Sequence, residues 1–155
     1  MKMTYLIIIA LTLGLSYVLF SCSTTKPAST PVETRDTIDQ ALIRLKAGSC
    51  RGKCKSYELA LFESGRATLM PKRNMEQTSP REIEISKEEL ASLTQIFESN
   101  DFLDLATSYL SPAKDIQQFE IIYQEKTVKF HKRKAPENLL VIWEALHQWV
   151  EDTPW

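Results

Sequence analysis

The chain has 155 residues, of which 43% are hydrophobic and 25% are charged, and its formal net charge is −1 at pH 7. This composition is typical of a globular protein, and the length allows one domain with accessory segments. Because the charges nearly balance, the composition gives no support for nucleic acid as a partner.

The N-terminal segment has the pattern of a secretory signal. Lys2 precedes an apolar run from Tyr5 to Phe20. As a helix this run would span roughly 24 Å, which is less than the ~30 Å hydrocarbon core of a bilayer. A basic start, a short apolar run and a small residue before a break are typical of a cleaved leader, so we expect residues 1–21 to be removed. The alternative is an uncleaved signal anchor.

The break falls on a cysteine. The four residues that end in Cys22 (Leu-Phe-Ser-Cys) resemble the bacterial lipobox, although Phe20 departs from its commonest form. The resemblance implies a lipidated Cys22 that anchors the protein to a membrane of the bacterial cell envelope, since each buried methylene contributes ~0.8 kcal/mol. Ser23 after this cysteine, rather than aspartate, favours the outer membrane over the inner one.

We expect a polar tether and one domain after the leader. Residues 22–37 are rich in Ser, Thr and Pro and have almost no apolar side chain. Such a segment cannot bury enough surface to offset the entropy cost of folding. Residues 38–155 should then form a single domain.

Alternation of apolar and polar residues predicts the strands of this domain. Ser64 and Gly65 supply the tight turn of a first hairpin, and a second hairpin follows later in the chain. Pro71 indicates that the return strand of the first hairpin ends there or lies on an edge. The predicted strands, in chain order, are residues 41–46, 57–62, 67–71, 82–85, 118–123 and 127–131.

Two segments have the apolar spacing of amphipathic helices. Ser86 and Glu89 form a capping box before the first, which runs past Phe97, and Pro136 precedes the second. The order of elements predicts an α+β fold, with an antiparallel sheet of about five to six strands built from hairpins and both helices packed on one face. The second helix has the widest apolar stripe: Leu139, Ile142, Trp143, Leu146, Trp149 and Val150.

Cys50 and Cys54 are the pair that remains once Cys22 carries lipid. In an oxidising compartment we expect them to form a structural disulfide that fixes the loop before Tyr57. The alternatives are a redox-active pair, whose spacing would differ from that of thioredoxin-type motifs, and a zinc site, for which two further ligands at matching spacing are lacking in the sequence.

Several of these features occur together: the segment Cys50–Cys54, Tyr57, the Ser64–Gly65 turn, residues 86–89 and residues 135–139. They resemble a family of bacterial domains of unknown function that is frequent in envelope lipoproteins and has the pattern Cys-x-Gly-x-Cys-Pro-x-Tyr. The resemblance covers roughly residues 40–150, with Lys55 in the usual proline position and Ser64 in the usual acidic one. It implies a fold and a location, because the family has no established activity.

Basic residues gather in two sets that contain no acidic residue. If the sets converge, they would form a cationic face for anionic lipid headgroups, lipopolysaccharide phosphates or an acidic protein. The alternative is a solvated strand face. The first set is Arg44, Lys46, Arg51, Lys53 and Lys55, and the second is Lys126, Lys129, His131, Lys132, Arg133 and Lys134.

The sequence has no catalytic motif that we recognise, and we expect no catalytic residue, cofactor or metal site. His147 is expected at the surface, His131 would need an orienting partner to act as a base, and Asp115 is expected to cap a turn. The leading hypothesis is a non-enzymatic, lipid-anchored module that contacts an envelope protein or an anionic glycolipid. The alternatives are a thiol–disulfide oxidoreductase that uses Cys50 and Cys54, and a purely structural envelope protein.

Overall fold

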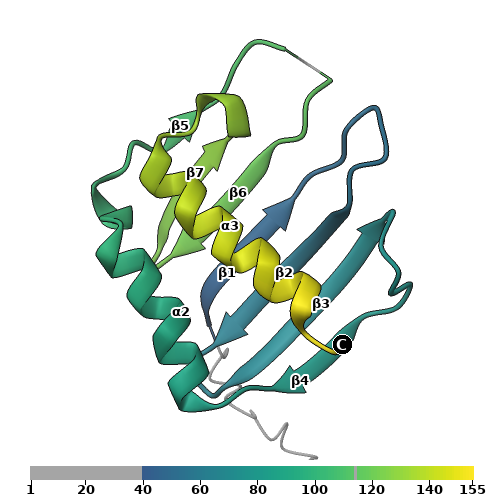
Figure 1. Cartoon of the computed structure of the whole chain (residues 1–155), viewed down its shortest axis with the longest axis vertical. Helices are drawn as coiled ribbons and strands as arrows, with labels where there is room; N and C mark the ends of the chain where they lie inside the picture. The colour runs from purple at the N-terminus through teal and green to yellow at the C-terminus, as the bar shows by residue number, and fades with distance from the viewer. Residues whose placement is uncertain (1–39, 114) are drawn as a thin grey trace, which may run out of the picture. The chain divides into compact units, whose positions relative to one another are not determined.

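The computed structural model describes residues 40–113 and 115–155 (Figure 1). The expected leader, Cys22 and the tether lie outside the described residues. Within the described ranges, no helix is both long enough and apolar enough to cross a bilayer.

A seven-stranded sheet forms one layer of the described part (Figure 1). Its strands lie in the order β4-β3-β2-β1-β6-β7-β5. The pairings described are antiparallel apart from the parallel pair β5–β7. The bounds are β1 (Ala41–Ala47), β2 (Ser56–Phe62), β3 (Arg66–Arg73), β4 (Arg81–Glu84), β5 (Ser108–Tyr109), β6 (Phe119–Tyr123) and β7 (Lys126–Phe130).

The α+β class is confirmed, but the expected count of five to six strands is too low. The additional strand is β5, whose two residues are too few to show any alternation. Backbone hydrogen bonds hold its segment beside β7: Lys129 N donates to Thr107 O at 3.0 Å, and His131 N donates to Tyr109 O at 3.1 Å. These bonds add a parallel edge strand to a sheet that is otherwise antiparallel.

Helices α2 (Lys87–Ser99) and α3 (Glu137–Asp152) both cover one face of the sheet, as predicted (Figure 1). Two short 3-10 helices, η1 (Phe102–Asp104) and η2 (Lys132–Lys134), precede β5 and α3 respectively. The predicted stripe of α3 packs against the sheet, with Trp149 partly buried and five residues buried: Leu139, Ile142, Trp143, Leu146 and Val150.

The predicted capping box is half formed. Ser86 Oγ accepts a hydrogen bond from Glu89 N at 3.1 Å, as expected for an N-cap. The Glu89 carboxylate instead accepts from Trp149 Nε1 at 2.7 Å. Glu89 therefore connects the start of α2 to the end of α3.

The core fills the space between the sheet and the two helices. In β1, Ile43 and Leu45 are fully buried on the helix side, while Arg44 is exposed on the opposite side. Pro71 pairs with Tyr57 of β2 but lies beyond the part of β3 that pairs with β4, so it occupies an edge as predicted. An aromatic cluster beside α2 has ring centroids 4.5 to 6.1 Å apart and consists of Phe97, Phe102 and Tyr123.

Candidate functional site

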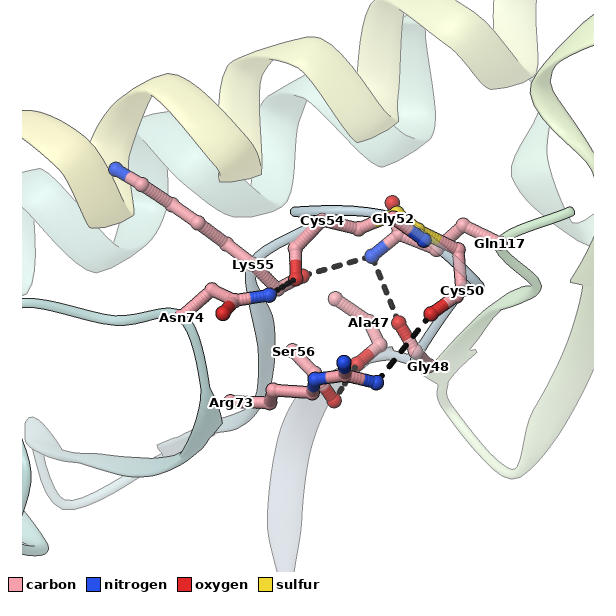
Figure 2. Close-up of a disulfide and its surroundings, with 10 residues drawn as sticks. All are labelled: Ala47, Gly48, Cys50, Gly52, Cys54, Lys55, Ser56, Arg73, Asn74 and Gln117. Carbon is pink, nitrogen blue, oxygen red and sulfur yellow. Dashed lines mark hydrogen bonds between the residues drawn. A yellow bond between two sulfur atoms is a disulfide. The ribbon is translucent and has the colours of Figure 1, made fainter.

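The loop between β1 and β2 is closed by its two cysteines (Figure 2). The sulfur atoms of Cys50 and Cys54 lie at bonding distance, and their Cα atoms are 5.9 Å apart, which is within the usual range for a disulfide. Side chains that follow β3 or end it bind the loop carbonyls. Asn74 Nδ2 donates to Cys54 O at 2.9 Å, and an Arg73 guanidinium nitrogen donates to Cys50 O at 3.4 Å.

Gln117 holds the two ends of this loop together. Its Nε2 donates to Gly48 O at 2.8 Å and to Lys55 O at 2.7 Å (Figure 2). Gly48 N donates to Gln118 O at 2.9 Å, and a Cβ at Gly48 would come within 2.8 Å of that oxygen. Only glycine permits this close approach. The cysteine loop therefore lies side by side with the segment before β6.

We call this region the loop end: residues 48–55, residues 115–118 and η2. Two adjoining pockets open there. The first, the Trp143 pocket, has a volume of about 220 Å³. It is lined by Ala47, Lys55, Tyr57, Gln117, Phe119, Lys132, Trp143 and His147.

His147, expected at the surface, is half-buried and lies in the wall of the Trp143 pocket. Its ring stacks on Trp143, with centroids 4.9 Å apart and planes 19° apart. Its Nδ1 lies 2.9 Å from the hydroxyl oxygen of Tyr57. The tyrosine of β2 covers a flank of α3 that the helical pattern alone assigns to solvent.

Tyr57 and His147 form a hydrogen-bonded pair of neutral groups near pH 7. Burial lowers the pKa of His147; the charges of Lys132 and Lys55 lower it too, while Glu151 opposes them. Burial raises the pKa of the Tyr57 phenol, and the charge of Glu151 raises it further. The pair thus offers hydrogen-bonding groups to the pocket without adding charge.

The second pocket, the His131 pocket, has a volume of about 230 Å³. It shares three lining residues with the first: Gln117, Phe119 and Lys132. The other lining residues are Ile116, His131 and Arg133.

Ser111 is the orienting partner of His131 that the sequence left unidentified. His131 is 6% exposed, and its Nδ1 accepts from Ser111 N at 3.0 Å and lies 3.1 Å from Ser111 Oγ. Because an amide N–H can only donate, the neutral ring carries its proton on Nε2. The Nδ1 lone pair is already engaged by the backbone, so this pair is not arranged as a base that activates a serine nucleophile.

Lys132 lies between the two pockets. Its Nζ is 3.5 Å from the centroid of the Trp143 ring, which is a cation–π contact. Trp143 is 6% exposed, and its indole Nε1 is buried without a hydrogen-bond partner among the described residues. A buried donor in that state costs about 1–3 kcal/mol.

The nine basic residues proposed for an anionic ligand divide among three places. Arg44, Lys46 and Lys129 lie on the sheet face opposite the helices, which we call the open face. Arg51 and Lys53 lie in the cysteine loop, where Arg51 pairs at 3.5 Å with Asp115, the aspartate expected to cap a turn. The remaining four lie at or beside the pockets: Lys55, Lys132, Arg133 and Lys134.

The two basic sets therefore meet in two places: on the open face, where Lys46 and Lys129 share Glu120, and at the Trp143 pocket, through Lys55 and Lys132. Lys55 also forms an ion pair with Glu151 of α3. No group of three histidine, cysteine, aspartate or glutamate side chains among the described residues is placed to bind a metal ion.

Comparisons with known proteins bear on the domain and leave the lipoprotein link and the cysteine pattern as predictions. No curated protein matches the sequence significantly. A family described as "Domain of unknown function (DUF6438)" matches residues 41–150, which is most of the chain and runs from the start of β1 into the last turn of α3. The chain therefore belongs to the DUF6438 family.

Proposed function

We propose that the protein is a lipid-anchored component of the bacterial cell envelope whose DUF6438 domain binds an anionic envelope component without catalysing a reaction. The lipobox-like sequence at Cys22 and the polar tether support the anchor. The loop end is the proposed binding surface.

One observation carries the binding proposal: basic side chains from both sequence sets line adjoining pockets. Lys55 and Lys132 line the Trp143 pocket, and Arg133 lines the His131 pocket beside it. Arg133 and Lys134 are exposed and have no ion pair with a described residue. An approaching anion would find positive charge here that is not already compensated.

The first experiment tests the anchor. Mass spectrometry of the membrane fraction should find acyl chains on Cys22 and a disulfide between Cys50 and Cys54. The Cys22→Ala variant should leave the membrane fraction. An unmodified Cys22 in the membrane-bound protein would contradict the anchor.

The second experiment tests the binding surface. The full chain, held by its anchor in neutral vesicles, should retain added vesicles that contain anionic lipid, and this retention should fall as salt rises. The double variant Lys132→Glu/Arg133→Glu should lose most of it. Arg44→Glu/Lys87→Glu, which reverses two exposed charges away from the loop end and changes the net charge equally, is the matched control and should keep it. Equal losses in both variants would contradict a binding surface at the loop end.

A second candidate function is thiol–disulfide exchange, and one contact favours it. Gly52 N donates to Cys50 Sγ at 3.2 Å, and such a donor would stabilise a thiolate on that sulfur. Turnover of a dithiol substrate that is lost in Cys54→Ser would support this function. An oxidised pair that shows no exchange with dithiols would exclude it.

A further inference from the structure

We infer that the Trp143 pocket and the His131 pocket together bind a small organic carboxylate that carries a planar apolar group. This inference rests on the proposed function, because it names the ligand chemistry of the same surface. The carboxylate would lie between Lys132 and Arg133, and its apolar group would lie on Phe119.

The charged groups around the His131 pocket favour an anion. Lys132 and Arg133 are consecutive residues of η2, and both line this pocket. No acidic residue lines either pocket, and Glu151 acts on Lys55 rather than on these two cations. A guanidinium matches a carboxylate in a bidentate geometry, which is why arginine is common where planar anions are bound.

One neutral donor in the wall of the His131 pocket adds to these charges. His131 Nδ1 is engaged by Ser111, which leaves the Nε2 hydrogen for another acceptor. An imidazole N–H beside two cations can donate to a carboxylate oxygen that enters the pocket.

The shape and the remaining lining favour a small ligand with an apolar part. The two adjoining pockets, of about 220 and 230 Å³, together reach only the lower part of the range of ~300–1,000 Å³ that is usual for drug-sized ligands. Phe119 is buried under both pockets, and Ile116 is an exposed aliphatic side chain at the rim of the second. A phosphate ion would satisfy the cations but would leave these apolar surfaces uncovered.

This ligand chemistry has two sources: a free aromatic acid, or the C-terminal carboxylate of a peptide that ends in an aromatic residue. The test uses calorimetric titration of the full chain in detergent with phenylacetate, phenylacetamide and inorganic phosphate. Phenylacetate should bind at one site, at least about tenfold more tightly than the amide or phosphate, because it alone combines the charge with the ring.

The variants locate the site. Arg133→Ala and Lys132→Ala should each weaken phenylacetate binding by about tenfold. Arg133→Lys should weaken it by less, because lysine keeps the positive charge but cannot bind a carboxylate in the bidentate geometry of a guanidinium. Arg44→Ala on the open face should leave the affinity unchanged. No detectable binding, equal binding of phosphate and phenylacetate, or an unchanged affinity in Arg133→Ala would overturn the inference.

Two further comparisons distinguish a free aromatic acid from a peptide C-terminus, and this inference from the proposed function. A peptide that ends in phenylalanine should bind more tightly than phenylacetate if the natural ligand is a chain terminus, and its C-terminal amide should not bind. If phenylacetate fails while vesicle retention still depends on Arg133, this inference is wrong and the proposed function stands. If neither depends on Arg133, both are wrong.

Discussion

The open face and the loop end contain the same kinds of basic side chain in different electrostatic settings. On the open face, Glu120 accepts from Lys46 at 2.9 Å and from Lys129 at 3.3 Å. On the same face Glu58 accepts from Lys72 at 2.6 Å. At the loop end, three consecutive basic residues of η2 have no ion pair with a described residue: Lys132, Arg133 and Lys134.

Sheet register explains the difference. Glu58 lies opposite Lys46, Lys46 lies opposite Glu120, and Glu120 lies opposite Lys129, so charges alternate in sign along one row across β2, β1, β6 and β7. Opposite charges placed directly across a sheet pair with each other. Residues of η2 lie outside the strands, so no acidic residue faces them across a strand pair. The number of basic residues is therefore a poor guide to the charge available to a ligand, because the register decides which ones are already compensated.

The largest expected effect is a loss of stability when a buried side chain of the pocket wall is truncated, compared with an exposed side chain on the open face. Trp143→Ala removes a side chain that is 6% exposed and lies edge-on to Phe119, with ring centroids 5.2 Å apart. It should lower the free energy of unfolding by about 3–5 kcal/mol in denaturant titrations. Met70→Ala on the open face, where the side chain is 45% exposed, should cost less than about 0.5 kcal/mol. Similar small losses would show that the pocket wall is not part of the core.

Removal of the disulfide should have the next largest effect and should be confined to the loop end. The closed loop is short, so Cys50→Ser/Cys54→Ser should lower the free energy of unfolding by about 2 kcal/mol. Amide exchange should become faster near Gln117, which is bound to both ends of the loop, and should stay unchanged at Lys46 on the open face. A reductant should destabilise the wild type and have no effect on the double variant. Faster exchange throughout the sheet would contradict a local role.

A pH titration should separate the two regions because their titrating groups respond in different ranges. The pKa of His147 is lowered in the folded protein, so the unfolded chain takes up the proton first as the pH falls below about 6.5. The free energy of unfolding should therefore decrease from pH 7 towards pH 5. His147→Asn, which can still reach the Tyr57 hydroxyl but does not titrate, should show a smaller decrease. An identical decrease in both proteins would place the titrating group elsewhere.

Much of the fold was predictable because residues that face the core are apolar, and their spacing differs between strands and helices. Leu45 and Lys46 fall on opposite faces of β1 as the alternation indicates, and the stripe from Leu139 to Val150 is the buried face of α3. The strand β5 gave no such signal, because two residues cannot show a period. Its place depends on backbone hydrogen bonds to β7 from a distant part of the chain.

For the candidate site, the sequence indicated the basic residues but not how they are arranged. The two basic sets were visible in the sequence, but the meeting of Lys55 and Lys132 depends on the pairing that places the start of β2 and the end of β7 at the same end of the sheet. The contact between His147 and Tyr57 was not predictable, because a helical pattern identifies the apolar face of α3 and not the neighbour that lies beside its flank. The role of Gln117 was not predictable from the sequence. A single glutamine has no recognisable pattern, and its two hydrogen bonds form only because the fold brings two distant backbone carbonyls to its side chain.

The smallest effect on stability belongs to Glu120, and it tests the electrostatic comparison most directly. Burial alone would raise the pKa of Glu120, but hydrogen bonds and charges from Lys46 and Lys129 outweigh it, so the pKa is lowered. The carboxylate therefore stabilises the fold above about pH 4.5, and this contribution is lost as the pH falls further. Glu120→Gln should cost less than about 1 kcal/mol at pH 7 and should flatten the pH dependence of unfolding in that acidic range.

The same variant should change what the open face can bind. With Glu120 neutral, Lys46 and Lys129 lose their shared partner, and their side chains are already 44% and 47% exposed. Retention by anionic vesicles should then increase at low salt, and Lys132→Glu/Arg133→Glu should no longer abolish it, because a second cationic surface is present. Glu88→Gln in the first turn of α2 changes the net charge equally and should leave retention as in the wild type. If both glutamate variants raise retention alike, net charge governs binding and the pairing on the open face does not.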